Sequence, residues 1–302
     1  MIRVKITENG QTRVLRLLAR GVNSDYRPGV LSDRRLHVPE STGARVTILP
    51  KLFSIFRGAG YQPLTGYSPS HFYNCREAPF THFLHENQLR GCPGLALQEI
   101  MFIEQFRDFV APKRILIVGN ALGWSTIALA LVFPAAKTVA IDIDTDGIDF
   151  TNRLIATHGL SARAVTARSP DDVAVVVREH LGGLIDFSLI DAVHTDEALL
   201  ADFAAVHAMS DQRAFYLLHD VINWNMTAGV QTLVTRYELT TKILTRTASG
   251  MALAYKALSP EFEAYLECFA EPAGVFAKLR NAYLENYVDP IRAFSTAARR
   301  AQ

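Results

Sequence analysis

The chain has 302 residues and a formal net charge of +1 at pH 7, because 31 lysines and arginines balance 30 acidic residues. Hydrophobic residues make up 49% and charged residues 20%, which is typical of one large or two small packed domains and excludes a disordered chain. The balanced charge gives no electrostatic reason to expect a nucleic-acid partner.

No apolar stretch reaches the roughly 18–20 residues that span a bilayer, so we expect no membrane partner. The start of the chain lacks the apolar core of a signal peptide. The three cysteines form neither a zinc-binding pattern nor a disulfide framework. We therefore expect a cytoplasmic protein.

Residues 1–90 read as a small N-terminal cap module, for substrate binding or oligomerisation. Alternating apolar and polar residues in Ile2–Thr7 and Thr12–Leu18 flank Asn9-Gly10, which favours a β-hairpin because Asn-Gly readily adopts a positive φ. A loop-rich stretch with a strand-like run at Ala44–Leu49 follows. Aromatic residues then cluster, and either line a pocket or form the module's core: Tyr61, Tyr67, Phe72, Tyr73, Phe80 and Phe83.

Residues 91–258 alternate short apolar strands with helical patterns, which indicates an α/β domain with a mostly parallel sheet. The expected strands are Ile115–Val118, Thr138–Ile141, Ala164–Ala167, Ile185–Ile190 and Ala214–Leu218. The expected helices are 97–110, Ser125–Phe133, Asp144–His158, Asp171–Leu181 and Asp196–Met209, with another near Thr232. Two further strand-like runs, Thr241–Arg246 and Met251–Lys256, surround Ala248-Ser249-Gly250 and predict a terminal antiparallel hairpin.

Residues 259–302 are expected to form a helical C-terminal extension that mixes aromatic and charged residues. Its apolar side chains must be buried, either on the domain or on a partner. We therefore expect a homodimer to which the termini contribute.

A glycine-containing turn follows the first strand of the α/β domain, between Gly119 and Thr126. Asp142 ends the next strand, at a spacing from which a carboxylate can accept hydrogen bonds from ribose hydroxyls. The spacing favours an adenosine-type ligand over an ordinary βα turn with a solvated acid. The glycines do not form the GxGxxG pattern of dinucleotide sites, which argues against a nicotinamide cofactor.

Four segments, VGNALGWST, AIDID, LIDAVHTDEALLADF and FYLLHDV, resemble class I S-adenosylmethionine-dependent methyltransferases, in particular the small-molecule O-methyltransferase subgroup. The resemblance covers roughly residues 95–256. It implies a Rossmann-like class I methyltransferase sheet, S-adenosylmethionine as cofactor and a small-molecule acceptor as partner. The cofactor-binding positions that it implies are Gly119, Asn120, Ala121, Gly123, Trp124, Ser125, Asp142, Ser169 and Asp191.

Within that resemblance, Gly119, Asn120 and Gly123 would face the methionine part of the cofactor. Asp142 would bind the ribose, and Asp191 would lie near the sulfonium. Ser169 falls near adenine, at a position where relatives often carry an acid or a small polar residue.

Asp191, His194, His219 and Asp220 are the candidate catalytic residues, at the ends of the fourth and fifth strands. In metal-dependent relatives the acids after these strands hold a divalent cation, so Mg²⁺ is one reading of the cluster. It is not favoured, because Val221 replaces a common Asn and a hard cation prefers oxygen ligands to His219. The alternatives are a His–Asp general-base pair centred on His219, or histidines that only cap loops.

We therefore expect the protein to transfer a methyl group from S-adenosylmethionine to a small molecule in secondary metabolism. The acceptor atom would be an oxygen or, less favourably, a nitrogen. Two alternatives stay open at this point. One is a nicotinamide-dependent oxidoreductase. The other is a non-catalytic methyltransferase-fold subunit used for binding or assembly.

Overall fold

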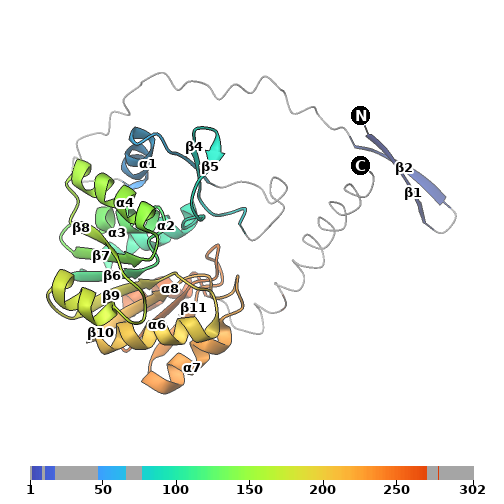
Figure 1. The fold of residues 1–302 in the computed structure, drawn as a ribbon. Coiled ribbons are helices and arrows are strands. Elements are labelled where there is room, and N and C mark those ends of the chain that lie inside the picture. The colour runs from blue at the N-terminus through green and yellow to red at the C-terminus, as the bar shows by residue number, and fades with distance from the viewer. Residues whose placement is uncertain (1, 9–10, 18–46, 66–76, 271–277, 279–302) are drawn as a thin grey trace. The chain divides into compact units, whose positions relative to one another are not determined.

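A computed structural model of the chain describes residues 2–8, 11–17, 47–65, 77–270 and 278, and the chain divides into two compact units, 1–45 and 46–302. The first unit contains β1 (Ile2–Glu8) and β2 (Gln11–Leu17), the blue arrows of Figure 1. They pair antiparallel in unbroken register, from Ile2 opposite Leu17 to Glu8 opposite Gln11. The strands predicted on either side of Asn9-Gly10 are confirmed.

The described part of the second unit contains a seven-stranded sheet with the order β11-β12-β10-β9-β6-β7-β8. Its strands are β6 (Arg114–Val118), β7 (Lys137–Asp142), β8 (Ala162–Thr166), β9 (Ile185–Ile190), β10 (Ser210–Leu218), β11 (Thr240–Ile243) and β12 (Ala252–Tyr255). Strands β6 to β10 run parallel to one another, whereas β12 is antiparallel to both β10 and β11. The predicted mostly parallel sheet with a terminal antiparallel hairpin is confirmed.

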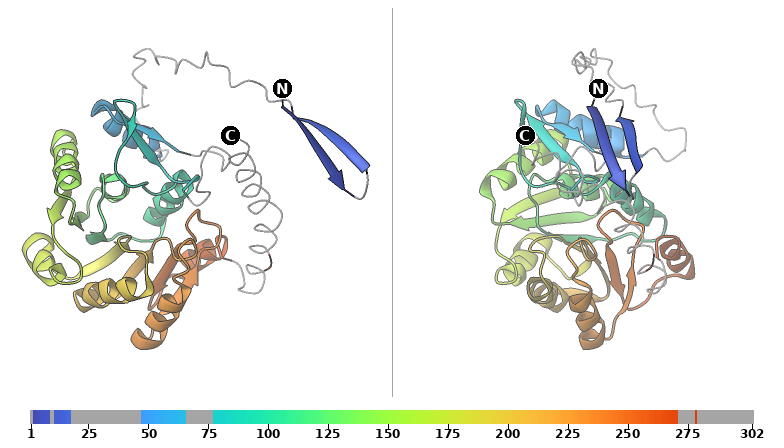
Figure 2. Two further views of the ribbon diagram at one scale, coloured as in Figure 1. Left: turned by 45° about the vertical axis from the view of Figure 1, so that its right-hand side comes forward. Right: turned by 90° about the vertical axis from the view of Figure 1, so that its right-hand side faces the viewer.

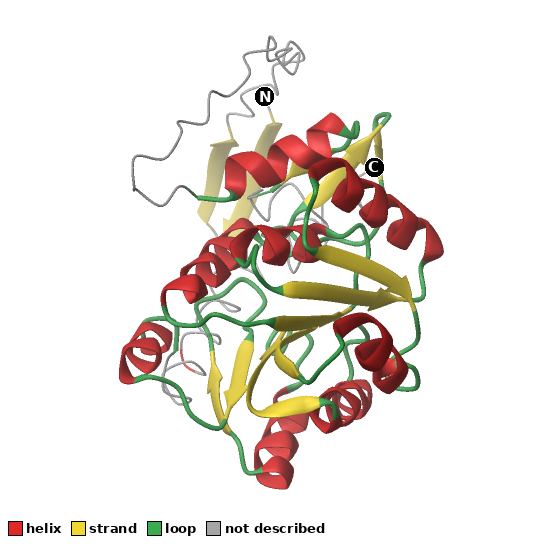
Figure 3. Ribbon diagram, turned by 90° about the vertical axis from the view of Figure 1, so that its left-hand side faces the viewer, coloured by secondary structure: helices red, strands yellow, loops and turns green. Residues whose placement is uncertain are grey.

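Helices cover both faces of this sheet (Figures 2 and 3). Their bounds are α1 (Leu49–Gly58), α2 (Leu97–Glu104), α3 (Trp124–Val132), α4 (Thr145–His158), α5 (Val173–Val176), α6 (Asp196–Ala208), α7 (Thr227–Tyr237) and α8 (Pro260–Glu267). A 3₁₀ turn, η2 (Gln105–Asp108), extends α2, and a π-helical turn, η3 (Val177–Leu181), extends α5. No helix in these ranges combines the length and the apolar character that crossing a membrane requires.

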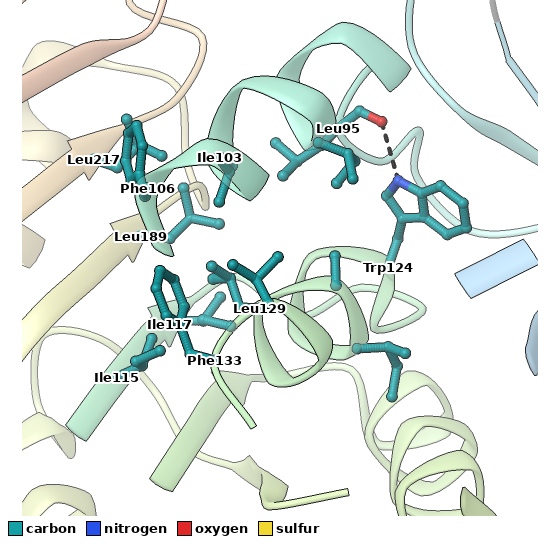
Figure 4. Packing of buried hydrophobic residues seen from close by; sticks show 14 of the residues in the cluster. Leu95, Ile103, Phe106, Ile115, Ile117, Trp124, Leu129, Phe133, Leu189 and Leu217 are labelled. Carbon is teal, nitrogen blue, oxygen red and sulfur yellow. Dashed lines mark hydrogen bonds between the residues drawn. The ribbon is translucent and has the colours of Figure 1, made fainter. Parts of the chain in front are cut away.

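Alternate residues of each buried strand enter two different cores, because successive side chains of a strand point to opposite faces. Ile115 and Ile117 join a core with α1, α2, α3, α4 and α8, whereas Leu116 and Val118 join a core with α5, α6 and α7. Figure 4 shows part of the first core. The apolar composition of these strands therefore follows from their burial on both faces.

The region before the sheet differs from its prediction. Residues 44–46 of the expected strand Ala44–Leu49 lie outside the described residues, and Leu49 begins the helix α1. Pro50 suits the first turn of a helix, and Leu52 and Phe56 bury one face of that helix in the first core. The described residues between 47 and 90 belong to the same compact unit as the sheet.

A small three-stranded sheet follows α1 and was not predicted from the sequence. Its strands are β3 (Gln62–Leu64), β4 (His82–His85) and β5 (Gln88–Leu89). Of the clustered aromatic residues, Phe80 and Phe83 are buried, and Tyr61 is partly buried against the first core. Tyr67, Phe72 and Tyr73 lie outside the described residues.

The beginning of the C-terminal extension is helical and packs on the domain itself. Phe262 and Leu266 of α8 are fully buried in the first core. The rest of the extension, 271–277 and 279–302, lies outside the described residues.

Candidate active site

A cavity of about 710 Å³ opens at the carboxyl ends of β6, β7, β9 and β10, where ligands bind in parallel α/β sheets. Residues 77–94 supply another wall, which includes Phe80 and Phe83. All but one of the site residues expected from the sequence line it: Gly119, Asn120, Ala121, Trp124, Ser125, Asp142, Ser169, Asp191, His194, His219 and Asp220. The exception among the described residues is Gly123.

The two glycines of the turn after β6 are required by packing. Gly119 has a φ of +98°, and a Cβ there would lie 1.8 Å from the carbonyl oxygen of Asp191. Gly123 has a φ of +80°, and a Cβ there would lie 2.3 Å from Thr151 Oγ1 on α4. Gly119 therefore permits the ends of β6 and β9 to meet at the cavity, whereas Gly123 permits α3 to approach α4.

The side chain of Asn120 holds the turn together from inside. Its Nδ2 donates to the carbonyl of Ala121 at 2.8 Å and to Thr151 Oγ1 at 2.9 Å. Its Oδ1 accepts from Thr126 Oγ1 at 2.8 Å. The side-chain amide is thus occupied by the protein, so Asn120 shapes the turn and does not present its side chain to a ligand.

Asp142 joins the end of β7 to the same turn. Its Oδ2 accepts from the backbone N–H groups of Asn120 and Ala121, both at 2.8 Å, and its Oδ1 accepts from Asp144 N at 3.0 Å. A carboxylate has about four acceptor positions, so these bonds leave room for a ligand hydroxyl. Asp142 therefore both shapes the turn and presents an acceptor to the cavity.

Trp124 lines the cavity but belongs mainly to the core, because the side chain is only 2% exposed. Its indole Nε1 donates to the carbonyl of Leu95 at 3.1 Å, the dashed line in Figure 4. Its ring also makes edge contacts with Phe53, Phe56 and Phe83. These contacts fix the start of α3 at the rim of the cavity.

Asp202, on α6, is a cavity residue that the sequence analysis missed. It is 5% exposed, and burial raises the pKa of its carboxyl group. The buried hydroxyl of Ser169, on the same cavity, acts in the opposite direction and lowers that pKa. Asp202 lies within the apolar run LLADF, so the sequence offered only the weak signal of an acid on a helix face that packs on the sheet.

His219 lies between two carboxylates. Its Nδ1 is 3.0 Å from Asp191 Oδ1, and its Nε2 is 3.0 Å from Oε2 of Glu99, a residue of α2 that the sequence analysis also missed. Ionised carboxylates only accept hydrogen bonds, so both ring nitrogens must donate. Burial lowers the pKa of His219, but the charges of Asp191 and Glu99 outweigh burial and raise that pKa well above its ordinary value. The His219 ring is therefore a buried cation.

Asp191 and Asp220 also hold His194. The Nε2 of His194 is 3.3 Å from Asp191 Oδ1 and 3.3 Å from Asp220 Oδ2, and its ring stacks on Trp224 with centroids 5.3 Å apart. Burial raises the pKa of Asp191, but the charge of His219 and the hydrogen bonds from both histidines lower it well below its ordinary value. The structure thus brings all four predicted catalytic residues together.

The donor atoms of this cluster do not fit a resident divalent cation. Potential ligand atoms of Asp191, His219 and Asp220 lie within 4.8 Å of one another. However, a doubly protonated His219 has no lone pair to offer a metal, and its positive charge already neutralises an acid. Val221 is fully buried and supplies no third oxygen ligand.

No protein-family model matches the sequence, and no curated protein matches it either. Solved structures with a similar fold include a putative caffeoyl-CoA O-methyltransferase from Staphylococcus aureus, with 17% identity, a TM-score of 0.46 and coverage of 55% of this chain and 86% of that one. An O-methyltransferase from Bacillus cereus in complex with SAH has 15% identity, a TM-score of 0.45 and coverage of 71% and 93%. The O-methyltransferase TomG from Streptomyces achromogenes, in complex with SAM, has 18% identity, a TM-score of 0.45 and coverage of 71% and 91%.

The strands of this chain themselves define its fold. The parallel order β10-β9-β6-β7-β8 is extended by β12, which lies antiparallel between β10 and β11. This arrangement is a Rossmann-like, mostly parallel sheet with a terminal antiparallel hairpin, as expected from the sequence.

Proposed function

We propose that the protein transfers a methyl group from S-adenosylmethionine to an oxygen of a small molecule. The observation that carries the proposal is one cavity that joins two kinds of group. On one side lies the turn after β6, held by Asp142. On the other side lies His194 with its two acids. A ligand held by the first side would present its reactive end to the second.

The cavity offers matching partners for the separate parts of this cofactor. Asp142 would accept from the ribose hydroxyls. Ser169 and Asp202 would accept from the amino group of adenine. Near the sulfonium, the carboxylates of Asp191 and Asp220 leave an excess of negative charge after His219 has offset one of them, which suits a cationic cofactor.

When bound, the cofactor supplies a methyl carbon attached to a positively charged sulfur. That methyl group would pass to the acceptor oxygen, and the electron pair of the carbon–sulfur bond would stay on sulfur. The protein aligns the two partners and receives the proton that the hydroxyl loses.

We assign the proton to His194 and prefer it to His219, the base favoured by the sequence analysis. Both nitrogens of His219 already donate to carboxylates, so that ring has no position to accept a proton. His194 uses Nε2 for Asp191 and Asp220, and no hydrogen bond within the described ranges reaches its Nδ1. An imidazole with a free nitrogen can accept the proton of a bound hydroxyl group.

The acceptor side of the cavity is aromatic, with Phe80, Phe83 and Trp224 in its wall. Trp224 is 47% exposed and Val193 is 64% exposed, so apolar surface borders the base. Phenols are therefore suitable probes for the acceptor. We also propose a role in secondary metabolism. Residues 1–90 would serve as a module for substrate binding or for oligomerisation.

The deciding experiment is a calorimetric titration with S-adenosylhomocysteine and, separately, NADH, followed by an assay of S-adenosylhomocysteine release with catechol and caffeic acid as probes. Micromolar binding of S-adenosylhomocysteine, no binding of NADH and turnover with a phenol would support the proposal. Binding of NADH alone would favour the oxidoreductase. Binding of S-adenosylhomocysteine without turnover on any probe would favour the non-catalytic subunit.

We also propose that the protein is a homodimer. Because Phe262 and Leu266 are buried within the domain, the dimer contact would involve the extension beyond residue 270 or the first unit. Light scattering on the full chain and on a chain that ends at residue 270 tests this. A monomer in both samples would overturn it.

A further inference from the structure

We infer that Glu99 is a positioning residue of the candidate active site, acting through a chain of contacts from Glu99 to His219, from His219 to Asp191 and from Asp191 to His194. The inference rests on the proposed function, because it explains how the proposed base is held. It adds a residue from α2, which lies outside the sheet.

Glu99 is fully buried, and all of its hydrogen bonds within the described residues come from three segments far apart in the chain. Its Oε2 accepts from Ala96 N at 2.9 Å and faces His219 Nε2 at 3.0 Å. Its Oε1 accepts from Ser249 N at 2.8 Å and from Ser249 Oγ at 2.6 Å. The carboxylate therefore joins the start of α2, the end of β10 and the loop before β12.

A buried carboxylate is costly unless a cation pairs with it. The partner here is His219, which is 4% exposed and contacts the ring of Phe80 at a centroid distance of 5.7 Å. The charged groups that face His219 are Glu99 from α2, and Asp191 and Asp220 from the strand ends. Glu99 and Asp191 lie on opposite sides of the ring, so each of them favours the doubly protonated form.

His219 and His194 share two carboxylate oxygens. Oδ2 of Asp220 is 3.5 Å from His219 Nδ1 and 3.3 Å from His194 Nε2. Oδ1 of Asp191 is 3.0 Å from His219 Nδ1 and 3.3 Å from His194 Nε2. If His219 lost its second proton or turned, Asp191 and Asp220 would both lose a charged partner, and the carboxylates that hold His194 would be free to move. Glu99 therefore determines the orientation of His194 from three contacts away.

A purely structural Glu99 would only tie α2 to Ser249. Glu99→Gln separates the two roles, because a glutamine side chain can still accept from Ser249 but carries no charge to pair with His219. The matched control is Glu104→Gln. Glu104 is on the same helix, is 2% exposed and accepts from Ile48 N at 2.9 Å, but it does not line the cavity.

The experiment uses the full chain with ¹⁵N-labelled histidine and records the imidazole nitrogens by NMR between pH 6 and 9. The His219 signals are identified as those that a His219→Gln variant lacks. In the native protein and in Glu104→Gln, we expect both ring nitrogens of His219 to carry protons at pH 7.5. In Glu99→Gln, we expect a singly protonated ring and a shift of the His194 signals.

A singly protonated His219 in the native protein would overturn the inference even if Glu99→Gln failed to fold. Unchanged His219 and His194 signals in a folded Glu99→Gln variant would also overturn it. None of these measurements needs methyl transfer, so failure of the proposed function would show separately, in the titration with S-adenosylhomocysteine.

With the phenol that turns over best, Glu99→Gln should lower kcat about 100-fold, because a small displacement of a catalytic group has effects of that order. The KM for S-adenosylmethionine should change less than about threefold. Glu104→Gln should leave both constants unchanged. Native kcat in Glu99→Gln would overturn the positioning role.

Discussion

The two sides of the cavity are built in different ways. The turn after β6 is held by its own backbone and by Asn120 and Asp142, within about one βαβ unit of the chain. The cluster at the ends of β9 and β10 is held by side-chain charges, and its deepest member, Glu99, is 120 residues from His219. The turn depends on backbone hydrogen bonds to one carboxylate nearby in the chain, whereas the cluster depends on the charges of several side chains that face one another. The following variants test this difference.

The largest effect is expected on the charged side. His194→Ala should lower turnover of a phenolic probe roughly 10²–10⁴-fold, the usual range for loss of a general base. Calorimetry should find the affinity for S-adenosylhomocysteine within about threefold of native. His207→Gln is the control, because His207 pairs with Tyr216 away from the cavity. Native turnover in His194→Ala would exclude this residue as the base.

On the turn side, Gly119→Ala should destabilise the protein by about 3 kcal/mol, from the forbidden φ and the contact with the Asp191 carbonyl. The free energy of unfolding in urea measures this. Gly159→Ala is the control, because Gly159 also has a positive φ, of +60°, but nothing lies within 4 Å of a Cβ there. Equal losses in the two variants would show that the close approach at Gly119 is unimportant.

Asp142→Ala should weaken binding of S-adenosylmethionine about tenfold or more, because charge-assisted hydrogen bonds contribute roughly 1.5–3 kcal/mol. Asp142→Asn keeps the shape of the side chain and should lose less affinity for S-adenosylmethionine. Isothermal titration of the folded variants gives both values. An affinity equal to native in Asp142→Ala would remove this residue from the cofactor site.

The stability of the charged side should depend on pH. His219 has a raised pKa when folded, so its contribution is complete below about pH 6.5 and declines as pH rises toward the folded pKa. Asp191 has a lowered pKa, so its contribution is present above about pH 4 and is lost at more acid pH. Urea midpoints of the native protein should therefore fall between pH 6.5 and 9, more steeply than those of His219→Gln. Parallel curves would contradict this.

The smallest expected effect is that of a chelator. EDTA should leave turnover unchanged, because a protonated His219 already occupies the place between Asp191 and Asp220. Added Mg²⁺ should not change turnover either. Loss of activity in EDTA, restored by Mg²⁺, would show that the cluster holds a metal after all.

Much of the sheet and of the turn could be predicted from the sequence, because each depends on residues close together in the chain. The apolar strands, Gly119 and Asp142 are local signals of this kind. The cluster was predicted only in part. Asp191 and Asp220 directly follow strands, and this position identified them as candidate site residues. Glu99, by contrast, looks like an ordinary acid in the first turn of a helix. Only the tertiary structure shows that it reaches His219.

The prediction for the region before the sheet was incorrect at Leu49 for another reason. Ala44–Leu49 is apolar enough for a strand, and its pattern is too short to distinguish a strand from a helix start. The buried spacing of Leu52, Ile55 and Phe56, together with Pro50, decides for α1 once the first core is known. Packing against the first core, and not the local strand propensity, therefore determines the structure at Leu49.

The bonds from Ser249 to Glu99 have a consequence for the order in which the protein is made. Chains fold from the N-terminal end as they leave the ribosome. A nascent chain can form the turn after β6 once α4 has emerged, but Glu99 lacks two of its donors until residue 249 is outside. The turn after β6 is thus complete about 90 residues of synthesis before the side that holds the base, counted from the end of α4 at His158 to Ser249.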